Sequence, residues 1–203
     1  MPKVGMEPIR RRQLIEATIA SIHEYGFADT TVSRISAAAG VSSGIVHHYF
    51  GGKADLLEAT MRWLMTDLRR QVVDRLARTR SPYDRLQAII DGNFAPEQFS
   101  QQAVTAWVAF WAHAPQTPEL GRLQRINTER LQSNLRHSLK AFVRPEQATR
   151  TALGMAALID GLSVRCALAK GGLLPAEARR IACDHLAAEL ATAASGQASG
   201  GNA

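Results

Sequence analysis

The apolar residues of this chain recur mainly at intervals of three and four, the spacing that places them on one face of an α-helix. One such pattern runs from Pro8 to Gly26, and a longer one runs from Lys53 towards Arg80. Alternating apolar and polar residues bounded by hairpin turns, which would indicate β-strands, are nearly absent. The pattern therefore predicts an all-α protein.

Local start signals locate further helices. Ser81-Pro82 and Thr117-Pro118 each pair an N-cap residue with a proline at the first helical position. They predict helices that reach about residue 93 and about residue 142. Further helices are expected over 101–113, 145–170 and 175–192, which makes about nine in all once two short ones are added.

The two short helices are predicted over Val32–Ala39 and Ser43–Tyr49, with Gly40 in the turn between them. Helices of this length are unstable alone, so they must pack against the rest of the chain. Thr31 and Ser42 stand at their N-termini as capping residues. This arrangement is typical of a helix-turn-helix.

The second short helix leaves small or hydrogen-bonding side chains on its outer face. These are the groups that a recognition helix needs to approach base edges and phosphates in DNA. A metal site is disfavoured, because adjacent histidines point about 100° apart on a helix and no usual ligand lies four residues from either. The two histidines also fit a simpler interpretation, as solvated residues on an exposed helix. The outward set is Ser43, Gly44, His47, His48 and Tyr49.

Composition adds modest support. The formal net charge of +6 favours an anionic partner such as nucleic acid. The two cysteines, Cys166 and Cys183, lack the spacing of a zinc or redox motif, which fits a reducing cytosol. No continuous apolar run reaches the roughly 18 residues of a membrane span, and no phosphate-binding loop or hydrolase motif is present. The sequence predicts an intracellular protein that is not an enzyme.

The stretch "TTVSRISAAAGVSSGIVHHYFGGKADLL" resembles the DNA-binding segment of TetR-family transcriptional repressors. The resemblance implies an all-helical homodimer that binds operator DNA and carries a variable ligand-binding domain. The expected division is a helix-turn-helix domain over 8–68, an effector-binding and dimerisation domain over 69–193, and a disordered Gly/Ser-rich tail over 194–203. The last two helices are expected to form the dimer interface.

The family pattern also assigns roles to residues of the helix-turn-helix domain, which we call the head. It implies that Thr31, Ser42, Tyr49 and Lys53 contact the DNA backbone. Ser43, Gly44 and His48 become candidates for base edges. His47 departs from the family, where tyrosine is common at this position, so the contact of that hydroxyl is lost or replaced by imidazole here.

Segments beyond the head, among them "AWVAFWA", "LQRINTERLQSNL" and "ALIDGL", look like the choline-responsive branch of this family. These regulators repress genes for choline uptake and glycine betaine synthesis. The resemblance implies a cytoplasmic repressor with choline as its effector and no cofactor. The alternatives are a sensor of another hydrophobic or cationic ligand, an enzyme, and a helical interaction protein that does not bind DNA.

The expected effector site is aromatic. Trp107 and Trp111 lie four residues apart on an apolar helix and share a face. Aromatic faces attract quaternary ammonium groups through cation–π interactions, so the two indoles could form half of a cage for choline. The residues that could complete it are Tyr83, Phe94, Phe99 and Phe110. The competing interpretation is that the tryptophans only fill the core.

Asp160 is the second effector candidate. It shares a helical face with Leu153, Ala157 and Val164, and a carboxylate in an apolar stripe is costly unless it is paired. Its partner would be the cation of the effector or an arginine from elsewhere in the chain. A position in the dimer interface is the third possibility.

Overall fold

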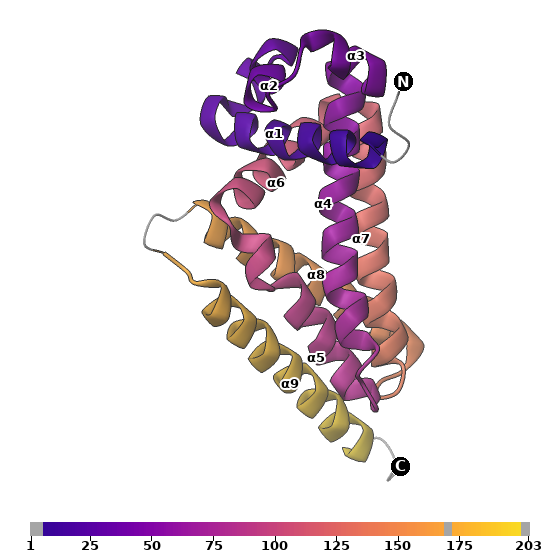
Figure 1. Ribbon diagram of the computed structural model, residues 1–203. Helices are drawn as coiled ribbons and strands as arrows, with labels where there is room; N and C mark the ends of the chain where they lie inside the picture. The colour runs from indigo at the N-terminus through magenta and orange to yellow at the C-terminus, as the bar shows by residue number, and fades with distance from the viewer. Residues whose placement is uncertain (1–5, 169–171, 200–203) are drawn as a thin grey trace. The chain divides into compact units, whose positions relative to one another are not determined.

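The computed structural model describes residues 6–168 and 172–199 and contains nine α-helices within this part of the chain (Figure 1). The all-α prediction is confirmed. Two short 3-10 helices, η1 (Pro96–Phe99) and η2 (Ala114–Gln116), flank α6. The α-helices are α1 (Met6–Asp29), α2 (Val32–Ala38), α3 (Ser43–Phe50), α4 (Lys53–Leu76), α5 (Pro82–Asn93), α6 (Gln101–His113), α7 (Pro118–Leu139), α8 (Pro145–Leu168) and α9 (Pro175–Ser199).

The starts of α2 and α5 agree with the prediction, and their capping bonds form. The Thr31 hydroxyl accepts a hydrogen bond from the backbone N–H of Arg34 at 3.2 Å. Ser81 and Asp84 form a complete capping box at the start of α5, each side chain accepting from the other residue's backbone N–H. Ser42 occupies the N-cap of α3 in extended backbone, but its side chain makes no capping bond.

The predicted helix ends agree less well. Helix α4 ends at Leu76 rather than near residue 80, and α1 continues to Asp29 across a kink at Gly26, where φ is 80°. Helix α9 reaches Ser199, so it occupies much of the tail that was predicted to be disordered from residue 194. Residues 200–203, and the predicted end of the helix at 169–170, lie outside the described residues.

The helices form two compact units. The first contains the described residues up to Asp67 together with Ser100–Gln124, and the second contains Leu68–Phe99 and the described residues from Arg125 onward. One boundary between the units falls on α4, between Asp67 and Leu68. Helix α6 and the first turns of α7 belong to the first unit, where α6 packs against α1.

In the first unit, α1 packs against α2, α3 and α6. The apolar faces of the helix-turn-helix close against the centre of α1, and Ile22, Ile35 and Val46 are each 0% exposed. This burial stabilises two helices that are too short to be stable alone. The predicted helix-turn-helix is therefore present, and it is built on α1.

In the second unit, α9 packs along α8 and α5 (Figure 1). Its core joins buried residues of all its helices, with Leu86, Leu135 and Met155 each 0% exposed. Helix α8 has a mean hydropathy of 1.4 over an 18-residue window, which is apolar enough by length and composition to cross a membrane. The expectation of no such segment was therefore too strict, but a core helix passes the same test and one face of α8 lies in this core.

Candidate DNA-binding and effector sites

Helix α3 divides its residues between the core and solvent as a recognition helix requires. Val46 and Phe50 are buried, whereas Ser43, Gly44, His47 and His48 are exposed, and Tyr49 is half-buried. A Cβ atom added to Gly44 would meet only the Ser42 hydroxyl, at 3.8 Å. The N-terminal half of the exposed face therefore carries only small side chains, so the backbone of α3 can approach base edges closely.

Arg11 of α1 holds the C-terminal end of α3. Its guanidinium donates a hydrogen bond to the carbonyl of Tyr49 and lies 4.4 Å from the centroid of the Phe50 ring. Gly51, with φ of 72°, ends the helix, and its N–H donates to the carbonyl of His47. Sequence reasoning overlooked Arg11. The signal available was the run of three arginines in α1, but nothing local shows that one of them reaches α3.

The two histidines of α3 have different environments. The Nδ1 of His47 lies 3.1 Å from the carbonyl oxygen of Gly51, and a carbonyl only accepts, so this nitrogen carries the proton. In the neutral ring, Nε2 is then the free acceptor. The ring of His48 lies edge-on to that of Tyr49, with centroids 4.9 Å apart. His48 is thus the histidine with both ring nitrogens available to a base edge.

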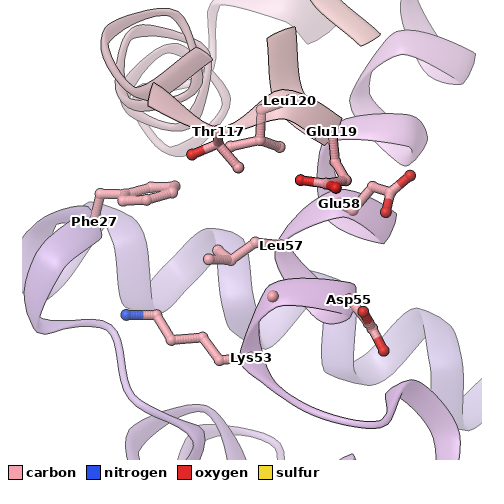
Figure 2. A pocket seen from close by; sticks show the side chains of 9 residues that line it. Phe27, Lys53, Asp55, Leu57, Glu58, Thr117, Glu119 and Leu120 are labelled. Carbon is pink, nitrogen blue, oxygen red and sulfur yellow. The ribbon is translucent and has the colours of Figure 1, made fainter. Parts of the chain in front are cut away.

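Lys53 begins α4 and lies beside a cavity of about 540 Å³ in the first unit. Figure 2 shows its side chain extending towards Phe27, and its ammonium donates to the carbonyl of Ala28 at 3.3 Å. Contact with a DNA phosphate would require release of that bond. Two carboxylates beside this cavity, Asp55 and Glu119, lie in the first turns of α4 and α7, where they complement the helix dipoles. The third, Glu58, is paired with Arg62 and Arg122, so all three have a structural explanation.

The excess positive charge is not carried by the head. The first unit contains eight basic and eight acidic residues, whereas the second contains sixteen basic and ten acidic residues. The net charge of the chain is therefore not evidence that the helix-turn-helix binds nucleic acid, because the excess positive charge lies in the second unit. DNA binding by the head depends on the arrangement of its groups rather than on its net charge.

Trp107, Phe110 and Trp111 belong to the first unit. The two indole rings lie 6.0 Å apart and are tilted by 36°. Trp107 and Phe110 are buried. The indole N–H of Trp111 is also buried, and no acceptor for it lies among the described residues. An unpaired buried donor of this kind is uncommon and favours any state in which it is paired.

Helix α6 also contacts the head directly. The ring of His113 stacks on Phe27 of α1, with centroids 3.9 Å apart and planes 22° apart, and Phe110 meets the same ring edge-on at 5.8 Å. Nearer the start of α6, the Thr105 hydroxyl is hydrogen-bonded to His23 of α1 at 3.0 Å. The tryptophans are therefore on a helix that packs with the helix supporting the recognition helix.

The other effector candidates belong to the second unit. Tyr83 is half-buried, and Phe94 is buried and stacked on Phe99, with ring centroids 6.0 Å apart. Asp160 is half-buried and has no partner among the described residues, and burial raises its pKa from 3.8 to about 6. The stripe beside it is on the surface of the chain, with Leu153 57% exposed, so the expected apolar surroundings are not supplied by this chain alone.

Two short helices packed on a third, with a polar exposed face on the second, define a helix-turn-helix DNA-binding protein. The family described as "Bacterial regulatory proteins, tetR family" matches residues 14–60, and "BetI-type transcriptional repressor, C-terminal" matches residues 82–191. The chain belongs to the TetR family of transcriptional regulators and, within it, to the BetI-type repressors.

Relatives of the chain support this assignment over more than nine-tenths of its length. It is 50% identical to the HTH-type transcriptional regulator BetI 2 of Chromohalobacter salexigens, with 92% of this chain and 91% of the relative covered. It is 46% identical to BetI of Serratia proteamaculans, with 94% and 97% covered.

Solved structures share the fold. A transcriptional regulator from Pseudomonas aeruginosa PAO1 matches with a TM-score of 0.80 at 26% identity, covering 91% of each chain. A transcriptional regulator from Saccharomonospora viridis, solved in complex with choline, matches with a TM-score of 0.74 at 21% identity, covering 87% of this chain and 95% of that one.

Proposed function

We propose that this protein is a homodimeric, cytoplasmic repressor of genes for choline uptake and conversion to glycine betaine, and that choline relieves the repression. The similarity to BetI regulators over both the head and the C-terminal region supports this function. The choline complex of a regulator with the same fold supports the choice of ligand. The observation within this chain that carries the proposal is the tryptophan pair on α6.

The trimethylammonium group of choline would lie against the faces of Trp107 and Trp111, where each cation–π contact contributes about 0.5–2 kcal/mol. The free N–H of Trp111 would donate to the choline hydroxyl and so gain the acceptor that it lacks in this structure. Phe110 lies between the two tryptophans in sequence and supplies further aromatic surface. Tyr83 and Asp160 of the second unit remain candidates from the sequence.

Operator binding would use the exposed face of α3. Ser43, Gly44 and His48 would face base edges in the major groove, since they are the exposed residues without another role in the head. The backbone contacts would come from Thr31, Ser42, Tyr49 and Lys53, which flank that face, with His47 beside them. Arg11 would position α3 without contacting DNA itself.

Choline would act through α6. A ligand shifts a conformational equilibrium only if it binds one state more tightly than the other. Because α6 stacks on α1 through His113 and Phe27, a shift of α6 around bound choline would be passed to the support of the recognition helix. The altered head would then fit the operator less well.

A second copy of the chain would cover the exposed apolar residues of α8 and α9. Leu153 and Leu168 of α8 are 57% and 68% exposed, and Ile181 of α9 is 37% exposed. Large apolar side chains gathered on paired helices are typical of an interface. Dimerisation would also place two heads on the two halves of a near-palindromic operator.

The test is a titration of the protein against the DNA upstream of its own gene, with and without choline. Binding that weakens as choline is added supports the proposal. If binding is unchanged at every choline concentration, the protein is a repressor that responds to a different effector. A thermal-shift panel of hydrophobic and cationic compounds would then identify that ligand, since a true effector raises the midpoint of unfolding.

A further inference from the structure

A cavity of about 610 Å³ lies in the second unit, between the end of α5, η1 and the start of α9. Its walls are mainly apolar and include Phe94, Phe99 and Leu174. The two phenyl rings are stacked with their planes 16° apart. This geometry leaves room for the apolar body of a small molecule beside a flat aromatic wall.

The charged groups around this cavity are two arginines and one aspartate, Arg75, Arg179 and Asp91. The Nε of Arg179 donates to the Asp91 carboxylate at 2.6 Å, so the one acidic group is already neutralised. Arg75 donates through a single nitrogen, Nη1, to the carbonyl and side chain of Gln71. The lining therefore carries an excess of one positive charge.

Both guanidiniums retain N–H groups without an acceptor among the described residues. Arginine has five donors in a planar fork that matches the two oxygens of a carboxylate. The first turn of α9 also lines the cavity, and the N-terminus of a helix carries partial positive charge. A cation such as choline would be repelled here, although Phe94 was a sequence candidate for binding it.

We infer that this cavity binds a small organic anion, a carboxylate with an apolar body, through Arg75 and Arg179 with the body against Phe94 and Phe99. All the residues that line this cavity belong to the second unit, whereas the tryptophan pair belongs to the first. The repressor would then respond to two ligands of different charge. The inference does not depend on choline being the effector.

The test compares three probes with the same six-carbon chain and different head groups: hexanoate, 1-hexanol and hexyltrimethylammonium. The measurement is the dissociation constant of each by titration calorimetry, supported by the thermal midpoint of the whole protein. We expect hexanoate to bind at least tenfold more tightly than either of the others. Equal binding of hexanoate and hexanol would overturn the inference.

Variants distinguish the loss of a positive charge in the cavity from a disruption of its structure. Arg179→Gln should weaken the binding of hexanoate at least tenfold. Arg180 is the adjacent exposed arginine and does not line the cavity, so Arg180→Gln should leave hexanoate binding unchanged. Asp91→Asn breaks the same ion pair but frees Arg179, so it should bind hexanoate as tightly or more tightly. Loss of binding in both Arg179→Gln and Asp91→Asn would show that the ion pair merely holds the fold, and would refute the assignment.

Discussion

Replacing Asp160 with asparagine should stabilise the protein at neutral pH. Burial raises the pKa of this carboxyl from 3.8 to about 6, and no described residue pairs with it. Each pKa unit corresponds to about 1.4 kcal/mol, so the ionised carboxylate costs the folded state up to about 3 kcal/mol. Asparagine has nearly the same shape and carries no charge, so Asp160→Asn removes this cost.

The sign of the pH dependence follows from the raised pKa. Above pH 6 the carboxyl is ionised in both the folded and the unfolded protein, and the full penalty applies. As the pH falls through 6 towards 3.8, the folded protein takes up the proton first and the penalty is relieved. The gain from Asp160→Asn should therefore shrink from about 3 kcal/mol at pH 7.5 to about 1 kcal/mol at pH 4.5.

Urea unfolding at pH 7.5 and pH 4.5 measures this difference, at one protein concentration because the proposed dimer would unfold in a concentration-dependent way. Asp184→Asn, at an exposed acid on α9, is the matched control and should change little at either pH. A gain that is equal at the two pH values, or a loss at pH 7.5, would refute the reasoning. The choline affinity of the same variant tests whether the cation uses this carboxylate.

Two further substitutions test the head and the second unit. His48→Ala should weaken operator binding by about 1–3 kcal/mol, the value of one base contact, and leave binding to unrelated DNA nearly unchanged in a gel-shift comparison. An equal loss of affinity for both DNAs would indicate that His48 contacts a phosphate rather than a base. Gly92→Ala should lower the free energy of unfolding in urea by about 1–3 kcal/mol, because the new Cβ would lie 2.5 Å from Cγ2 and 2.8 Å from Cα of Val72. Gly154→Ala, with nothing within 4 Å, is the helical control, and an equal effect of the two would contradict the packing argument.

The nine-helix pattern and the helix-turn-helix were predictable from sequence because their signals are local. The Ser81–Asp84 capping box spans four residues, and the left-handed glycines that end α2 and α3 lie within a few residues of the helices they terminate. The outward face of α3 followed from which of its eight residues are apolar. Helix ends were less certain, as the extension of α9 to Ser199 shows.

The partners of each helix were decided only by the tertiary structure. The apolar pattern of α6 indicated a buried helix, but it did not show that Phe110 and His113 would meet Phe27 on α1. The same limitation applied to Arg11, which reaches the carbonyl of Tyr49 38 residues away. Periodicity shows that a face is buried and does not show what buries it.

The sequence by itself therefore determined the helices and the chemistry of the recognition helix, since both depend on residues within one or two turns. The tertiary structure decided which candidate residues share a site. It placed Phe94 and Arg179 around one cavity, where Arg179 pairs with Asp91, 88 residues away in the sequence. It also placed the excess positive charge in the second unit rather than the first. Such long-range pairings depend on how all the apolar faces are buried together, which no single stretch of sequence encodes.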